Sequence, residues 1–225
     1  MMKNRVVGAV TIGQSPRVDL VPELISIIGP DIEIREAGAL DGLTKDEIAA
    51  FAPKAGDYVL VTRLADGSSV KVAEQHVTPR LMERIYGLFS QGIEVVALLC
   101  TGEFPELAGG GLLVRPQLIL YNVAQAVSGG LKLGVVCPDA DQIPQAQARW
   151  RSAGREQVIV AASPYGDPAE PETAARILKD QGVQLVVLDC IGYTLAMQEA
   201  VRTITGAPVI LARGILARVL KELVG

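Results

Sequence analysis

The sequence is poor in aromatic and histidine side chains and has no excess of basic charge. Aromatic residues make up 4% of the 225 positions, and His76 is the single histidine. Lysine and arginine total 21 against 25 acidic residues, which gives a net charge of −4. A nucleic-acid-binding protein would carry a basic surface instead, so we expect no nucleic-acid partner. A single histidine cannot supply a His-rich metal site, so no bound metal is expected.

Long apolar runs and recognisable cofactor motifs are also missing. No apolar stretch approaches about 18 residues, and the N-terminal segment turns polar too early for a signal peptide, so we expect no membrane association. The glycine run at 109–111 lacks the Lys-Ser/Thr of a phosphate-binding loop and the spacing of a dinucleotide fingerprint, so no cofactor is predicted. Three cysteines without a CxxC spacing do not form a disulfide scaffold, which favours a reducing, cytoplasmic location.

What the sequence does contain is strand-like and helix-like segments in alternation. Apolar residues make up 49% of the chain, and continuous Val/Leu/Ile/Ala runs predict strands that are buried on both faces. Helical patterns lie between them, including one at 69–77 and another at 79–91, which we separate at Thr78-Pro79. This alternation predicts an α/β fold with parallel sheets. The predicted strands are 6–12, 32–36, 58–62, 95–99, 133–137, 158–162, 185–189 and 209–211.

An internal repeat divides the chain. Residues 91–102 (QGIEVVALLCTG) align with residues 181–192 (QGVQLVVLDCIG) at a constant offset of 90 positions. A repeat of that length predicts two similar α/β halves related by pseudo-twofold symmetry. The first half comprises residues 1–110 and about 209–225, and the second comprises 111–208, with the boundary at Gly109–Gly111.

The repeat places a cysteine at the carboxyl end of a buried strand in each half, at Cys100 and Cys190. Ligands of parallel α/β sheets bind at that end of the strands. If the halves face one another, the two sulfurs meet across one cleft, where one thiolate removes a proton from Cα of a carboxylate and the other thiol returns one. The alternative is that these cysteines only pack, as free cysteines usually do. Packing is the better hypothesis for Cys137, which has no repeated partner.

Several polar residues near predicted strand ends are candidates to bind the substrate anion. Ser15 and Arg17 follow the first strand, although Ser15 could only cap a helix and Arg17 could be solvated. Arg63 could instead form a surface pair with Asp66, and Tyr193 could pack in the core. The candidate substrate-binding residues are Ser15, Arg17, Thr62, Arg63, Thr101, Gly192 and Tyr193.

Four segments resemble the AroM family over essentially the whole chain: residues 11–17 (TIGQSPR), 52–56 (APKAG), 145–150 (QAQARW) and 188–193 (LDCIGY). That family is similar to the aspartate/glutamate/hydantoin racemase superfamily. The resemblance implies a fold of two α/β halves around a two-cysteine cleft, and it carries the racemase roles onto Cys100 and Cys190. Residues 14–17 (QSPR) replace the loops found in many racemases. With a single working cysteine, a protein of this kind could decarboxylate or isomerise its substrate instead.

Two hypotheses of different classes follow. The first is a cofactor-independent racemase-like or isomerase-like enzyme that acts on a small carboxylate, such as an amino acid or a substituted malonate. The second is a non-catalytic binding or sensor protein that uses the same cleft. The sequence leaves open the identity of the carboxylate and whether the chain forms a homodimer.

Overall fold

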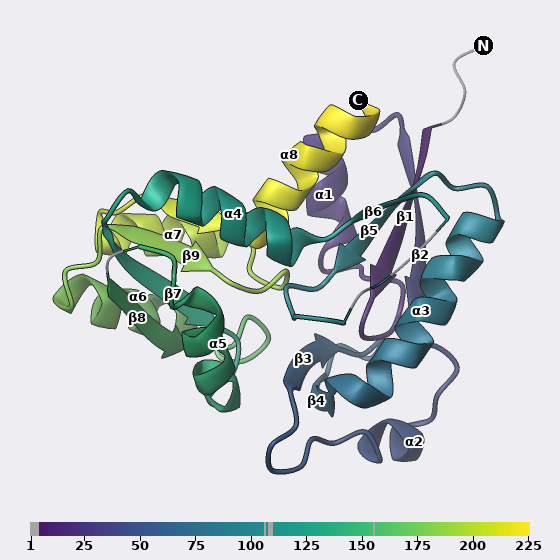
Figure 1. Ribbon diagram of the computed structural model, residues 1–225, viewed down its shortest axis with the longest axis horizontal. Helices are drawn as coiled ribbons and strands as arrows, with labels where there is room; N and C mark the ends of the chain where they lie inside the picture. The colour runs from purple at the N-terminus through teal and green to yellow at the C-terminus, as the bar shows by residue number, and fades with distance from the viewer. Residues whose placement is uncertain (1–4, 106, 108–109, 155) are drawn as a thin grey trace. The chain divides into compact units, whose positions relative to one another are not determined.

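The computed structural model describes residues 5–105, 107, 110–154 and 156–225 (Figure 1). The chain divides into two compact units. Unit 1 runs up to Pro116 and resumes at Ala217–Gly225, and unit 2 is Gln117–Leu216. The strand at 209–211 pairs within the sheet of unit 2, so the chain returns to unit 1 later than residue 209. Gly109, where the sequence suggests a boundary, lies outside the described residues.

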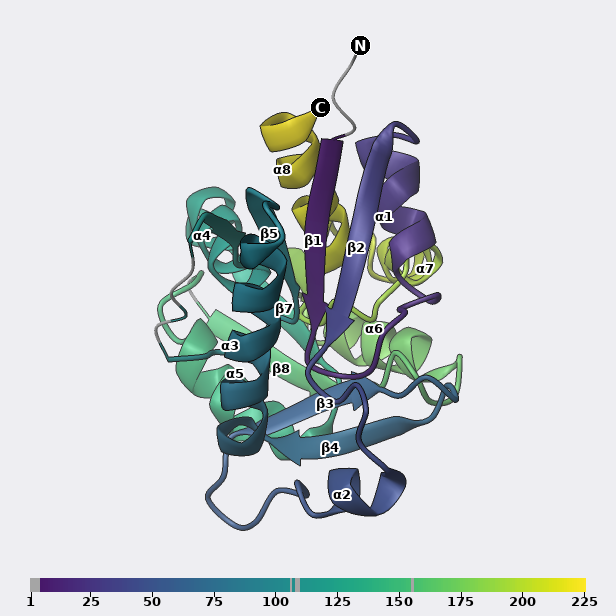
Figure 2. The same ribbon diagram turned by 90° about the vertical axis from the view of Figure 1, so that its right-hand side faces the viewer.

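Unit 1 is built on a four-stranded parallel sheet in the order β2-β1-β5-β6. Its strands are β1 (Arg5–Thr11), β2 (Ile32–Gly38), β5 (Val95–Leu99) and β6 (Leu112–Val114). Thr11 pairs with both Gly38 and Leu99, so the loops after β1, β2 and β5 leave the sheet at the same edge. In Figure 2, β1 and β2 run side by side with their carboxyl ends towards the hairpin of β3 and β4.

The remaining elements of unit 1 are α1 (Val21–Ile28), α2 (Lys45–Ala49), β3 (Val59–Arg63), β4 (Ser69–Ala73) and α3 (Glu74–Ser90). The prediction of a helix at 69–77 is right only for residues 74–77, which begin α3. Residues 69–73 form β4 instead, which pairs antiparallel with β3 through a turn at Asp66 and Gly67. Gly67 has a φ of +86°, and Asp66 accepts hydrogen bonds from the Ser68 amide and hydroxyl, so the turn is locally stabilised. Val72 then packs in the core, as alternation along a strand requires.

The predicted break at Thr78-Pro79 is also wrong, since α3 continues through Pro79. A proline inside a helix removes one backbone hydrogen bond. The helix is held instead by its apolar face, whose residues pack into the unit 1 core on both sides of the proline. These residues are Val77, Leu81, Ile85 and Leu88. Tertiary packing therefore outweighs the local preference of proline.

Unit 2 contains a second four-stranded parallel sheet, in the order β10-β9-β7-β8. Its strands are β7 (Lys132–Cys137), β8 (Glu156–Ala161), β9 (Leu185–Leu188) and β10 (Val209–Leu211). One face of the sheet packs on α6 (Glu170–Asp180) and α7 (Leu195–Thr205). The other face packs on α4 (Pro116–Ser128), α5 (Ile143–Trp150) and the start of α8 (Ala212–Val224), and a 3₁₀ turn at Ala140–Gln142 precedes α5.

The two sheets have the same topology. Read from its other edge, the unit 2 sheet is β8-β7-β9-β10, which corresponds strand for strand to β2-β1-β5-β6. Unit 1 adds α2 and the β3–β4 hairpin between its second and third sheet strands. The predicted α/β class with two similar parallel-sheet halves is therefore confirmed. No helix within the described residues has both the length and the apolar character that crossing a bilayer requires.

Candidate active site

Cys100 follows the last residue of β5 in unit 1 and begins a tight turn. The Gly102 amide donates a hydrogen bond to Cys100 Sγ at 3.2 Å. A Cβ at Gly102 would lie 2.5 Å from Leu60 Cδ2, so only glycine permits this close approach of the hairpin. Cys100 is 8% exposed and Thr101 is 6% exposed. The Cys100 side chain is thus largely buried, and its sulfur accepts a hydrogen bond from a backbone N–H of the turn.

Cys190 begins the corresponding turn after β9 in unit 2. The Gly192 amide donates to Cys190 Sγ at 3.3 Å, and Cys190 is 6% exposed. The fully buried Arg213 donates from Nε to the Ile191 carbonyl and from Nη2 to the Gly192 carbonyl, each at 3.0 Å. Arg213 therefore braces the backbone of this turn from the start of α8.

The two cysteine turns share one interaction. In each, the amide two residues after the cysteine donates to its sulfur, and in each the cysteine follows the third strand of the same topology. A hydrogen bond from N–H to sulfur stabilises the thiolate over the thiol. The repeat predicts that both cysteines lie at the carboxyl ends of strands, but the N–H to sulfur bond is visible only in the structure.

The loop after β1 is organised by Asp41, a residue that the sequence analysis missed. Its carboxylate accepts hydrogen bonds from the Ser15 amide at 2.8 Å, the Ser15 hydroxyl at 2.6 Å and the Gly38 amide at 2.7 Å. Asp41 thereby ties together the loops that leave β1 and β2. Its place shortly after a parallel strand is the signal that could have identified it.

Arg17 is buried at 2% exposure, and its guanidinium binds the protein's own Asp19. Two parallel bonds of 2.9 Å join them, and a third bond runs from Arg17 to Thr11 Oγ1 at 3.0 Å. Burial alone would raise the pKa of Asp19, but the hydrogen bonds and charge of Arg17 hold it below its ordinary value. The Arg17 guanidinium, which the sequence analysis names as a candidate to bind the substrate anion, therefore binds Asp19 and shapes the loop.

Arg63 lies at the end of β3 and takes part in the same cluster. Its Nε donates to the Gly67 carbonyl at 3.0 Å, and its Nη1 lies 3.8 Å from Asp19 Oδ2. Its surface pair is therefore with Asp19, whereas Asp66 pairs with Lys45. Ser15, Arg17 and Arg63 are thus brought together at the carboxyl edge of the unit 1 sheet.

Thr62 contributes a buried hydroxyl to this cluster. A Cβ at Gly13 would collide with Thr62 Oγ1, so the end of β3 lies directly against the loop after β1. Thr62 is 1% exposed, and within the described part of the chain no group forms a hydrogen bond with its Oγ1. Burying an unsatisfied hydroxyl is costly, so this atom is a strong candidate ligand contact.

We expect Thr62→Val to raise the free energy of unfolding by about 1 kcal/mol, because it removes an unsatisfied buried hydroxyl without changing side-chain volume. Thr11→Val is the matched control. Thr11 Oγ1 accepts bonds from the Gly13 amide and Arg17, so that variant should lose about 1–3 kcal/mol. Urea titrations measure both values. Equal losses in the two variants would contradict the interpretation that the Thr62 hydroxyl is unsatisfied in the folded protein.

Tyr193 does not present its phenol at the site as the sequence suggests. It is fully buried and donates its hydroxyl to the Ala162 carbonyl at 2.5 Å. Burial, with the charges of Cys190 and neighbouring groups, raises the pKa of Tyr193 well above its ordinary value. The phenol beside Gly192 belongs instead to Tyr165, which the sequence analysis missed.

Cys137 packs in the unit 2 core, with its Sγ near the carbonyls of Asp139 and Val160. Burial, followed by the charge of Asp189, raises the pKa of the Cys137 thiol from 9.0 to about 12. At neutral pH this cysteine is therefore a protonated core residue.

This shift predicts a specific loss of stability in alkali. A thiol whose pKa is higher in the folded state stabilises the fold below its unfolded-state pKa, and this contribution disappears as the pH rises towards 12. Between about pH 8 and pH 10.5, the wild type should therefore lose stability relative to Cys137→Ala, by at most about 1.4 kcal/mol per pH unit. Chemical unfolding at stepped pH checks this. Tyr193 titrates in both proteins, so parallel curves would refute the assignment to Cys137.

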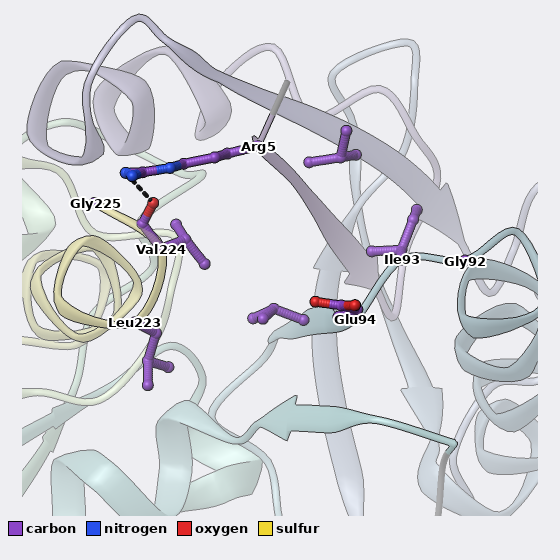
Figure 3. Close-up of a pocket in the computed structure, with 9 residues that line it drawn as sticks. Arg5, Gly92, Ile93, Glu94, Leu223, Val224 and Gly225 are labelled. Carbon is purple, nitrogen blue, oxygen red and sulfur yellow. Dashed lines mark hydrogen bonds between the residues drawn. The ribbon is translucent and has the colours of Figure 1, made fainter. Parts of the chain in front are cut away.

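A hollow of about 420 Å³ in unit 1 lies away from these residues (Figure 3). It is lined by the first residues of β1, by residues 92–95 at and just before the start of β5, and by residues 223–225 at the end of the chain. Arg5 donates to the Val224 carbonyl across it at 2.7 Å. Cys100 stands at the opposite end of β5. The hollow is therefore separate from the cysteine turn.

The two units, each built on a parallel sheet of the same topology, define an α/β protein whose fold is shared with solved racemases, an isomerase and a decarboxylase. Allantoin racemase from Klebsiella pneumoniae is similar in structure, with a TM-score of 0.63 and 14% identity over 98% of this chain and 87% of that one. The maleate isomerase Iso from Pseudomonas putida S16 has a TM-score of 0.61 and 14% identity over 97% and 93%. An unliganded arylmalonate decarboxylase has a TM-score of 0.61 and 15% identity over 98% and 93%.

At this level of identity, these structures show the fold alone. No curated protein matches the sequence. The family model described as AroM protein matches residues 7–224, so the chain belongs to the AroM family.

Proposed function

We propose that the protein is a cofactor-independent enzyme that transfers protons at the Cα of a small carboxylate, with Cys100 and Cys190 as the acid/base pair. One observation carries the proposal: the same N–H to sulfur turn follows the third strand of both sheets. A racemase-type fold supports it.

In the proposed reaction one cysteine is a thiolate and the other a thiol. The thiolate takes the proton from Cα, so an S–H bond forms while the electron pair of the C–H bond moves into the carboxylate. The second thiol then gives its proton to the opposite face of Cα and becomes the thiolate. No electron is gained or lost, and the amides of Gly102 and Gly192 stabilise whichever sulfur is charged.

Other residues in the proposal hold the anion or position the loops. Thr62 and Thr101, both buried at strand ends, would donate hydroxyl hydrogen bonds to the substrate carboxylate, and the partly exposed Arg63 would donate guanidinium N–H bonds. The Ser15 hydroxyl donates to Asp41, so Ser15 would contribute by holding the loop after β1 in place. Gly192 would act through its amide, which donates to Cys190 Sγ rather than to the anion. Arg17 acts indirectly, since its guanidinium fixes the loop that carries Ser15.

The experiment is exchange of the Cα proton in deuterated water, followed by NMR and chiral chromatography. Single enantiomers of amino acids, together with achiral 2-substituted malonates, form the panel. Loss of the Cα proton signal together with formation of the other enantiomer is the expected result. Saturable binding without exchange would identify a small-carboxylate sensor instead. Loss of CO₂ without exchange at Cα would identify a decarboxylase and overturn the two-thiol mechanism.

A further inference from the structure

Tyr165 lies in the loop between β8 and α6 and contacts the Cys190 turn. A Cβ at Gly192 would lie 2.6 Å from Tyr165 Cζ and 2.8 Å from Pro164 Cγ, and closer still to the Tyr165 hydroxyl. The phenol end of Tyr165 therefore lies directly against Gly192, the residue whose amide donates to Cys190 Sγ. Glycine at 192 is what permits this approach.

The loop that carries Tyr165 is held in place by its own hydrogen bonds. The Tyr165 amide donates to Ser163 Oγ at 3.1 Å. The amides of Ser163 and Asp167 both donate to the carboxylate of Glu170, at 2.7 and 3.2 Å. A side chain on a braced loop can hold a ligand with little loss of conformational entropy.

The two tyrosines near Cys190 differ in their surroundings. The hydroxyl of Tyr193 is buried and bonded to the Ala162 carbonyl. Tyr165 is partly exposed, and its hydroxyl lies against Gly192 of the Cys190 turn. Both Cys190 and Tyr165 act, after burial, on the pKa of Tyr193, which places the three side chains in one neighbourhood.

We propose that the Tyr165 hydroxyl donates a hydrogen bond to a carboxylate oxygen of the anion bound at the Cys190 turn. A phenol remains neutral at physiological pH and donates one directional bond. Such a bond strengthens as negative charge develops on the carboxylate oxygens during proton abstraction. This inference rests on the proposed function for the identity of the anion, but its test does not require turnover.

Two alkylating reagents of nearly equal size provide the test. Iodoacetate and iodoacetamide react with a thiolate in the same way: sulfur attacks the CH₂ carbon, a C–S bond forms and iodide leaves. Only iodoacetate carries a carboxylate. Peptide mass spectrometry at Cys190 gives a rate for each reagent. We expect Tyr165→Phe to lower the ratio of the iodoacetate rate to the iodoacetamide rate about 10-fold, with the iodoacetamide rate unchanged.

Tyr86→Phe, at an exposed position on α3, is the matched control and should leave the ratio unchanged. A parallel fall in both rates in Tyr165→Phe would show that Tyr165 only packs on the turn, and an unchanged ratio would exclude the hydrogen bond. Failure of both reagents to alkylate Cys190 in the wild type would also overturn the inference. If Cα-proton exchange is absent but the ratio falls as expected, the proposed function fails while the role of Tyr165 stands.

Discussion

We expect Cys190→Ala and Cys100→Ala each to lower the rates of Cα-proton exchange and of racemisation by about 10²- to 10⁴-fold. This is the usual contribution of a positioned acid or base. The physical reason is the same at both positions, because each turn directs a backbone amide at a sulfur that would carry negative charge in one half of the proposed reaction. Exchange in deuterated water and chiral chromatography measure the two losses.

Cys137→Ala is the control for this pair. It removes a cysteine that also lies at the end of a parallel strand. Burial raises the pKa of this thiol, so the thiol stays protonated at neutral pH. We expect it to retain activity within about twofold, with only the modest destabilisation of a small cavity. Thermal unfolding of all three variants separates loss of chemistry from loss of fold. Wild-type rates in either Cys100→Ala or Cys190→Ala would contradict the two-thiol mechanism.

Asp189→Ala should produce the largest loss of stability. Asp189 is 2% exposed, and its carboxylate accepts hydrogen bonds from Trp150 Nε1 at 2.7 Å and from Arg149. The Arg149 side chain is itself largely buried, so alanine at 189 removes the carboxylate that compensates a buried guanidinium. Loss of one partner from such a pair costs about 3–5 kcal/mol, or on the order of 10 °C in Tm.

The matched comparison is the double variant Arg149→Met with Asp189→Leu. Replacing both partners of a buried pair by apolar residues is often nearly neutral, so the double variant should recover a substantial part of the loss. Differential scanning calorimetry of the wild type, Asp189→Ala and the double variant measures the three Tm values. A loss below about 1 kcal/mol in Asp189→Ala would show that this ion pair contributes little to the fold.

The sequence predicts the sheets and the cysteine turns because those features are local or repeated. The predicted strand at 95–99 matches β5, and the one at 133–137 falls within β7, since buried parallel strands have an unmistakable apolar pattern. The aligned segments 91–102 and 181–192 form equivalent turns because similar residues at the same place in the same topology meet the same constraints.

What the sequence could not predict depends on contacts between distant residues. β4 forms because β3 pairs with it, and the isolated pattern of 69–77 is compatible with a helix as well. Arg17 is near Asp19 in sequence, yet its burial depends on the packing of the whole loop. Tyr165 and Gly192 are brought together by the order of β7, β8 and β9, which no local pattern contains.

The late return of the chain to unit 1 has a consequence for the order of folding during synthesis. Unit 2 is one uninterrupted stretch, whereas unit 1 needs Ala217–Gly225, and Arg5 bonds to Val224 across 219 positions. Contacts this far apart in sequence form slowly, because a long loop must close first. During synthesis, unit 2 can therefore fold before residues 217–225 are available to complete unit 1.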